Sequence, residues 1–342
     1  GQPCEVRLDI TASQDLLPGS VIEFQFPNSW LMLDGPSHTR PIQTLKPTAP
    51  HYMQVSAQGA SFDHAIRPRH LNHPAGSVRH GRLIAATLDQ GRVPAGQPVT
   101  LTYASTVAPQ VAETETLWLR VNGHAPEQPI QLNTTPGPAV RVRLLAPSSV
   151  RPGQTFDLLI VSLDEYSNVS NTKFENQLVR RDDGVILAQD LSFTVAVRIP
   201  ASIPKEGIYR YRMDGRLSNA IRVCKNPQGP FWGDLHIHSR LSHDACGADP
   251  LAYAKDASGL DFAAVADHVE SLGPEGVKQI IAWAGQARQE GRFVPILADE
   301  RNPHDWTGHH NLYAASQADY EANAPVPGKP SHFNPQEPAG PA

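Results

Sequence analysis

The hydrophobic pattern of the chain changes near Pro230, and this change limits the fold more than any other feature of the sequence. Before Pro230, short alternating apolar and polar runs recur between turn-forming pairs such as Pro-Gly, Asp-Gly and Asn-Gly. Alternation with a period of two places one face of each strand in a core, so these runs predict all-β, sandwich-like domains. After Pro230, near-continuous apolar strands alternate with helical patterns, which is typical of parallel α/β sheets.

A chain of 342 residues is long enough for two or three domains, and we expect three. A Pro-rich join at residues 134–138 marks the boundary between the first two. We predict a β-rich domain of uncertain topology over residues 1–136 and an immunoglobulin-like β-sandwich over residues 137–227. Residues 228–342 form the third domain, which is α/β and carries a Pro-rich tail.

Cap and breaker signals predict the order of elements in the third domain. Asp249 is a good N-cap and Pro250 suits the first position of a helix, while Gly259 and Gly291 suit helix ends. The expected elements are a strand over 231–238, a helix over 251–257, a strand over 260–266, a helix over 274–290, a strand over 293–298 and a fourth strand over 311–314.

Charge and hydropathy exclude two classes of partner. The net charge of −5 without a basic cluster gives no indication of nucleic-acid binding. No apolar run approaches the roughly 18 residues that a membrane-spanning helix needs. By analogy, β-sandwich modules that precede an enzyme suit a secreted or periplasmic protein, but a cytoplasmic location and the oligomeric state both stay open. Cys4 and Cys224 would pair only in an oxidising compartment.

Histidines occur in two different settings. His64, His70, His73 and His80 lie among Arg, Pro, Asn and Gly without a strand or helix pattern, so we expect a solvated loop. The histidines after Pro230, in contrast, follow apolar runs. His236 and His238 form an HxH pair, which places both imidazoles on one face of a strand.

Further acidic and imidazole groups follow this pair at the ends of the predicted strands. They are Asp244, Asp267, His268, Glu300, His309 and His310. The carboxyl ends of successive β-α units meet at one side of a sheet or barrel, so these side chains are expected to converge. A mixture of His, Asp and Glu suits Zn²⁺, Mn²⁺ or Fe²⁺ better than an all-oxygen Mg²⁺ site. Cys246 is either a neighbour of this metal site or a small buried apolar residue.

Three segments in this order resemble the polymerase and histidinol phosphatase (PHP) superfamily over roughly residues 228–315. They are Gly-Asp-Leu-His-Ile-His-Ser, Leu-Ser-His-Asp and Leu-Asp-Phe-Ala-Ala-Val-Ala-Asp-His. The resemblance implies a distorted (β/α)₇ barrel that holds two or three metal ions. It implies that the ligands are His236, His238, Asp244, His268, Glu300 and His309, with His310 as the alternative if the register differs by one. Asp267 would orient His268.

The sequence departs from this family after Glu300. The family closes its site with a further histidine and an Asp-x-His pair, and no Asp-x-His follows Glu300 here. His332 lies in a Pro- and Gly-rich setting that does not suit a ligand. The expected fold class is therefore multidomain, with two N-terminal all-β domains followed by an incomplete α/β barrel. We expect a piece of a longer protein, and loss of the terminal ligands is the alternative.

The expected function is that of a metal-dependent hydrolase, most simply a phosphoesterase. A metal-bound hydroxide would attack the phosphate ester of a small phosphorylated substrate. Arg240 and Arg301 flank ligands and would hold the phosphate, or they are ordinary surface arginines. Two alternatives remain open: a catalytically inactive binding or scaffold protein with a degenerate PHP domain, and a metallohydrolase of non-phosphate bonds.

Overall fold

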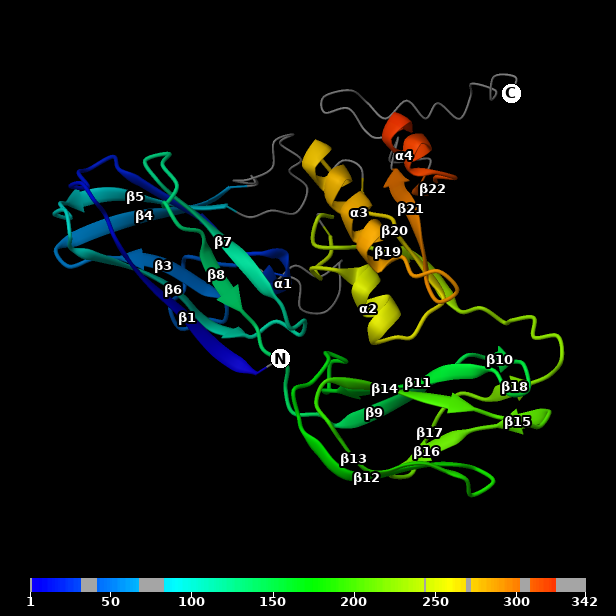
Figure 1. Cartoon of the computed structure of the whole chain (residues 1–342). Helices are drawn as coiled ribbons and strands as arrows, with labels where there is room; N and C mark the ends of the chain where they lie inside the picture. The colour runs from blue at the N-terminus through cyan, green and yellow to red at the C-terminus, as the bar shows by residue number, and fades with distance from the viewer. Residues whose placement is uncertain are drawn as a thin grey trace.

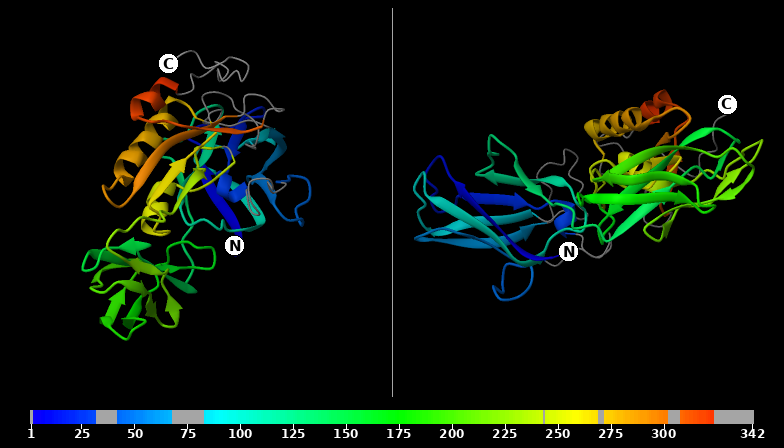
Figure 2. Two further views of the ribbon diagram at one scale, coloured as in Figure 1. Left: turned by 90° about the vertical axis from the view of Figure 1, so that its right-hand side faces the viewer. Right: turned by 60° about the horizontal axis from the view of Figure 1, so that its bottom comes forward.

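The computed structural model describes residues 2–31, 42–67, 83–242, 244–268, 272–301 and 308–323. Figure 1 shows three parts, which we call the N-terminal, middle and C-terminal parts. The N-terminal part contains β1 to β8 and α1, the middle part β9 to β18, and the C-terminal part β19 to β22 with α2 to α4. The right-hand view of Figure 2 shows the N-terminal part to the left of the other two.

The N-terminal part is a sandwich of two antiparallel sheets. One sheet has the order β1-β6-β3 and the other β4-β5-β2-β7-β8. Its elements are β1 Pro3–Thr11, β2 Val21–Gln25, α1 Asn28–Leu31, β3 Tyr52–Ser56, β4 Ala60–Arg67, β5 Leu83–Gly91, β6 Pro98–Val107, β7 Thr114–Val121 and β8 Ile130–Asn133. Alternate residues of facing strands, such as Phe24 and Tyr103, fill one core between the sheets. The predicted β-rich sandwich character of this part is confirmed.

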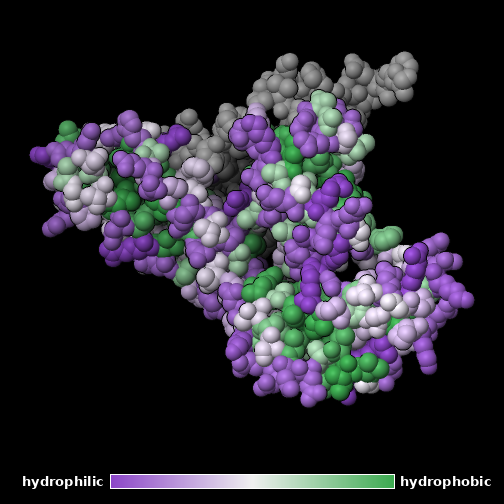
Figure 3. Space-filling view, in the orientation of Figure 1, coloured by the Kyte–Doolittle hydropathy of each residue, from purple (hydrophilic) through white to green (hydrophobic). Residues whose placement is uncertain are grey.

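The middle part is a second sandwich, as the sequence predicts. Its sheets have the orders β14-β11-β9, β13-β12-β16-β17 and β10-β18-β15. Its elements are β9 Arg141–Leu145, β10 Ser149–Val150, β11 Thr155–Leu163, β12 Phe174–Arg181, β13 Ile186–Phe193, β14 Ala196–Ser202, β15 Gly207–Tyr209, β16 Tyr211–Met213, β17 Arg216–Leu217 and β18 Ile221–Val223. Figure 3 shows hydrophobic residues on the visible face of this part, beside largely hydrophilic surroundings.

Strand β11 is buried on both faces over its second half. Phe156, Leu158 and Ile160 point into the core of the middle part. Leu159 and Val161 point the other way, into a second apolar cluster that includes Ala257. This strand therefore loses the polar alternation of a solvent-facing strand, because a helix covers its outer face.

The C-terminal part is an open four-stranded sheet with helices. The strand order is β19-β20-β21-β22, with the first three parallel and β22 antiparallel to β21. Its elements are β19 Gly233–Ile237, α2 Pro250–Asp256, β20 Phe262–Val265, α3 Pro274–Ala287, β21 Val294–Arg301, β22 His310–Tyr313 and α4 Gln317–Asn323. The Asp249 side chain caps α2 by accepting from the backbone N of Ala252 at 3.0 Å. Each element expected here from the sequence is present within a few residues.

The predicted α/β barrel is wrong. About 48% of the described residues are in strands and 11% in helices, so the chain is predominantly β. The connection from Arg301 to His310 is shorter than the roughly a dozen residues that a parallel crossover needs. The chain therefore turns back, β22 pairs antiparallel with β21, and the described sheet does not close.

Helix α2 joins the C-terminal part to the middle part. Ala257 at the end of α2 packs on Leu159, Val161 and Leu163. Polar contacts surround this apolar contact, including an ion pair of 2.9 Å between Arg198 and Asp256. Tyr253, Trp232 and Arg143 add hydrogen bonds to the middle part or across the same junction. Figure 1 shows α2 directly beside the sheet that contains β11.

The described residues also test three further expectations, on a membrane-spanning helix, a disulfide and the segment around His64. No helix among them is long and apolar enough to cross a membrane. Cys4 and Cys224 lie in different parts and form no disulfide with each other. The loop expected around His64 is wrong at that residue, because His64 lies on β4 and its Nε2 accepts from the backbone N of Val55 at 2.8 Å. The other three histidines of that segment lie outside the described residues.

Candidate metal centre

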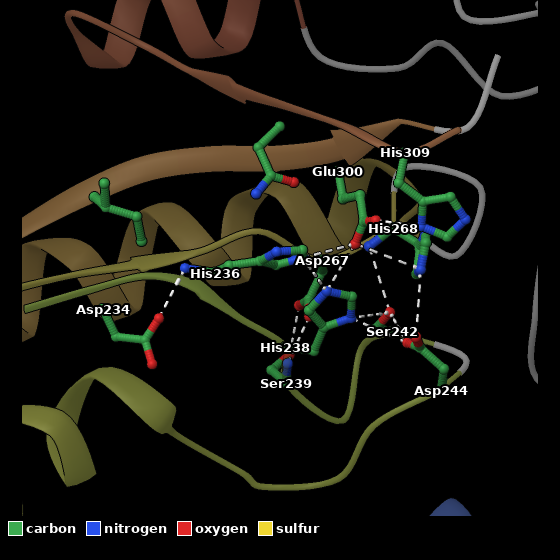
Figure 4. A network of polar contacts seen from close by, with 12 residues as sticks. Asp234, His236, His238, Ser239, Ser242, Asp244, Asp267, His268, Glu300 and His309 are labelled. Atoms are coloured by element: carbon green, nitrogen blue, oxygen red, sulfur yellow. Dashed lines mark hydrogen bonds and ion pairs between the residues drawn. The ribbon is translucent and has the colours of Figure 1, made fainter. Parts of the chain in front are cut away.

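The strand order of the C-terminal part brings the predicted ligands to one edge of its sheet. His236 is in β19 and His238 follows it, while His268 lies just beyond the end of β20. Glu300 is near the end of β21, and His309 immediately precedes β22. The carboxyl ends of the three parallel strands lie at this edge, and the antiparallel β22 begins there, so residues far apart in sequence meet. Figure 4 shows these side chains converging on the carboxylate of Glu300.

Glu300 is the centre of the cluster. Its Oε2 lies 2.8 Å from Nε2 of His238 and 2.9 Å from Nε2 of His236. The same oxygen lies 3.6 Å from Nε2 of His268, and Oε1 contacts Nδ1 of His309. The Glu300 side chain is only 2% exposed, so four imidazoles replace water around it. Burial favours the neutral acid, but the contacts with His236, His268 and His309 outweigh it and lower the pKa of Glu300.

Asp244 forms a second acidic point of the cluster. Its Oδ1 lies 3.1 Å from Nδ1 of His238, and its Oδ2 lies 3.3 Å from Nε2 of His268. Burial opposes ionisation of Asp244, but the hydrogen bonds with His238, His268 and Ser242 hold its pKa far below the usual range. His238 therefore lies between the two carboxylates. Burial lowers the pKa of His238, but Asp244 and Glu300 overcome this and raise it.

The six side chains form three overlapping groups with the spacing of metal ligands. The groups are His236, His238 and Glu300; His238, Asp244 and His268; and His268, Glu300 and His309. Within each group the ligand atoms lie within 4.8 Å of one another. Two ligands that are 2.0–2.2 Å from one tetrahedral metal ion are about 3.4 Å apart. The contacts of Glu300 Oε2 with His238 and His268, at 2.8 and 3.6 Å, are close to that spacing.

His310 lies outside these three groups. It begins β22 and pairs in register with Arg301, whereas His309 is on the cluster side. Neighbouring residues of a strand point to opposite faces, so only one of the two histidines can reach Glu300. The structure places His309 there.

Asp267 contacts Ser239 and not the ring of His268 that the sequence analysis expected it to orient. Its carboxylate accepts from the backbone N and from Oγ of Ser239, both at 2.5 Å, rather than orienting the ring of His268. Asp267 is fully buried, and that burial raises its pKa. Because Ser239 directly follows His238, this pair fixes the turn that places His238.

The structure brings neither of the two arginines expected to hold a phosphate into the cluster. Arg240 directs Nη1 to the carbonyl oxygen of Thr114 at 3.4 Å, in the N-terminal part. Arg301 is buried and pairs with Asp299, with Nε to Oδ1 at 2.8 Å and Nη2 to Oδ2 at 3.0 Å. Neither guanidinium faces the cluster.

Ser242 was missed by the sequence reasoning. Its Oγ donates to Oδ1 of Asp244 at 2.6 Å and accepts from the backbone N of His268 at 3.3 Å. A serine two residues before a ligand aspartate was the available signal, since short hydroxyl side chains bond to neighbours of this kind. Ser242 holds Asp244 toward the two histidines that share it.

Comparisons with known proteins do not support the family resemblance. No family model matches the chain, and no curated protein matches it. Solved structures that resemble it include the Escherichia coli adhesin FdeC, with 12% identity over 66% of each chain and a TM-score of 0.23. Another is the Yersinia pseudotuberculosis adhesin InvE, with 13% identity over 65% of this chain and 60% of that one, and a TM-score of 0.19.

The assignment to the PHP superfamily is therefore corrected, and with it the hydrolase and phosphoesterase expectations. Those expectations depended on the family and on its barrel. No family model and no curated protein supports that family for this chain, and the described sheet is open. TM-scores this low give no basis for assigning a function from the adhesins. The cluster around Glu300 has to be interpreted from its own geometry.

Proposed function

We propose that this chain is a binding or scaffold protein with a divalent metal centre, rather than an enzyme. The observation that carries the proposal is the convergence of four histidines on the buried Glu300, with Asp244 shared between two of them. A set of nitrogen and carboxylate ligands of this composition suits Zn²⁺, Mn²⁺ or Fe²⁺. The three overlapping groups would hold two or three ions if the central residues bridge them.

A binding role is supported by what surrounds the cluster. Both arginines that were expected to hold a phosphate are turned away from it. The buried Asp267 and Ser242 form hydrogen bonds with Ser239 and Asp244, and so position parts of the cluster. Two β-sandwiches make up the rest of the described chain. Bound metal would connect β19, β20, β21 and the segment before β22, because its ligands come from all four.

Elemental mass spectrometry on the purified chain, after dialysis against each metal, tests the metal centre. We expect two or three equivalents of Zn, Mn or Fe. The double variant His236→Ala with His238→Ala removes ligands from two of the three groups and is expected to lose at least one equivalent. His124→Ala changes an exposed histidine of the N-terminal part and serves as the control. Equal metal content in the double variant and the control would show that the assignment is wrong.

The non-catalytic part of the proposal needs its own assay. The metal-loaded chain is incubated with generic phosphate and carboxylate esters, and product release is compared with that of the double variant. We expect no difference between the two proteins. Turnover by the loaded chain that the double variant lacks would contradict a purely binding role.

A further inference from the structure

We propose that metal binding controls the docking of the N-terminal part through the loop after β19, whose described residues are 239–242 and 244–247. This inference rests on the proposed metal centre. The loop follows β19 and carries Asp244 on one side and contacts to the N-terminal part on the other. Metal that fixes Asp244 would thereby fix the surface on which the N-terminal part docks.

One side of the loop belongs to the metal cluster. Asp244 contacts His238 and His268, and Ser242 donates to Asp244 at 2.6 Å. Ser239, at the start of the loop, is held by the buried Asp267. An ion bound between Asp244 and Glu300 would offset their negative charge and would thereby order the loop further.

The other side of the same loop contacts the N-terminal part. The backbone N of Gly247 donates to Oε1 of Glu113 at 3.1 Å, and Nη1 of Arg240 donates to the carbonyl oxygen of Thr114 at 3.4 Å. The backbone N of Arg240 also donates to the carbonyl oxygen of Gly247 at 3.0 Å, which closes the loop on itself. Gly247 is only three residues after Asp244. A shift of Asp244 is therefore transmitted to Glu113 across a short closed segment.

Burial of Glu113 opposes its contact with the loop. Glu113 is 9% exposed, and its Oε2 has no hydrogen-bond partner among the described residues. A buried carboxylate with one oxygen unpaired is costly, so the contact with Gly247 must offset a large part of that cost. A loop that is held in place by metal keeps this contact, whereas a loose loop loses it and leaves Glu113 better placed in water.

The junction of the middle and C-terminal parts is of a different kind. There, Leu159, Val161 and Ala257 form an apolar cluster. Separating the two parts would expose this cluster to water, which is unfavourable. The N-terminal part meets the others through polar contacts such as those of Asn168 with Ala112 and Gln110. Polar junctions of this kind exchange their hydrogen bonds with water at little cost. The N-terminal part is therefore the one whose position a metal ion can change.

Hydrogen exchange on the full chain, with and without Zn²⁺ or Mn²⁺, tests the coupling. We expect metal to slow exchange about fivefold or more in residues 110–116 as well as in the loop. Glu113→Ala removes the acceptor without changing a ligand. It is expected to keep the metal stoichiometry, to lose the metal-dependent protection of residues 110–116, and to bind metal about fivefold more weakly, because coupling is reciprocal.

Two further variants complete the experiment. Glu127→Ala changes an exposed glutamate of the same part and should behave like the unchanged chain. Arg240→Ala breaks the contact from the loop side and decides the question if Glu113→Ala unfolds the N-terminal part. Metal that binds in full stoichiometry without slowing exchange at residues 110–116 would overturn the inference and leave the proposed function intact. Failure to bind metal at all would overturn both.

Discussion

Glu113 immediately precedes β7 and Glu115 lies within it, and burial changes the acidity of the Glu115 side chain. Glu115 points to the core side of its sheet, is 5% exposed and accepts a hydrogen bond from Ser29. Burial, with added repulsion from Glu113, raises the pKa of Glu115 to about 7, although Ser29 and Arg240 oppose the shift. In the unfolded chain the same carboxyl has a pKa near 4.5. The folded protein therefore retains a proton that the unfolded chain releases between these two values.

Glu115→Gln should remove the free-energy cost of ionising a buried carboxyl group, a cost that grows with pH. Between pH 4.5 and 7 the unfolded chain loses its proton first, so the free energy of unfolding of the unchanged protein falls as pH rises. A shift of this size corresponds to about 3 kcal/mol at most. We expect the glutamine variant to be more stable by about 1–3 kcal/mol at pH 8 and nearly equal at pH 4.5, measured by urea unfolding. Glu175→Gln, at an exposed position, is the control. A gap that stays constant with pH would contradict this origin.

The sequence could predict which residues converge on Glu300 but not the direction of every nearby side chain. His236, His238, His268 and Glu300 follow from strand periodicity and strand ends. The partner of Arg240 is Thr114, which is 126 residues away, and such a contact leaves no local pattern. Arg301 pairs with Asp299 on the same strand, a spacing of two that the sequence does show.

At the scale of elements, apolar runs and caps predict β19 to β22, α2 and α3, but they predict neither α4 nor the open form of the sheet. Near-continuous apolar sequence indicates a buried strand and carries no information on how many strands pair. The short connection before His310 was the sequence feature that excluded a parallel fourth strand. Pairing of β19 with β20 depends on a small residue, because Gly233 lies opposite Phe262.

Gly233→Ala should weaken this pairing. An added Cβ would lie 2.3 Å from ring atoms of Phe262, so the ring or the strand must move. We expect a loss of about 1–3 kcal/mol in the free energy of unfolding of the C-terminal part. Gly285→Ala is the matched control: it is exposed in α3 with nothing within 4 Å of the new Cβ, and should gain up to about 1 kcal/mol. Urea unfolding distinguishes them, and equal effects of the two substitutions would refute the packing argument.

At the scale of the whole molecule, the middle and C-terminal parts share an apolar cluster, whereas the N-terminal part has a core of its own. The N-terminal part has its own core around Phe24, Leu101 and Tyr103. The middle and C-terminal parts have separate cores but share the cluster that joins β11 to α2. The domain boundaries at residues 136 and 227 stay predictions. The apolar cluster that the middle and C-terminal parts share means that these two parts stabilise each other across residue 227.

Scanning calorimetry should show two unfolding transitions. One belongs to the N-terminal part, and the other belongs to the middle and C-terminal parts together. Metal should raise the Tm of the shared transition, and a chelator should reverse the effect. Leu101→Ala, at a fully buried position, should lower the Tm of the first transition only. The expected loss in the free energy of unfolding of the N-terminal part is about 2–5 kcal/mol. Three separate transitions, or a metal effect confined to the transition that Leu101→Ala lowers, would show that this division is wrong.

The double burial of β11 has a practical consequence for dissecting the protein. A fragment that ends at residue 227 looks like a complete sandwich, but it would expose Leu159, Val161 and Leu163 as one apolar face. Exposed apolar faces of this kind drive self-association, so the isolated fragment should be poorly soluble. A soluble fragment of the middle part would have to retain α2 or carry polar residues at those three positions.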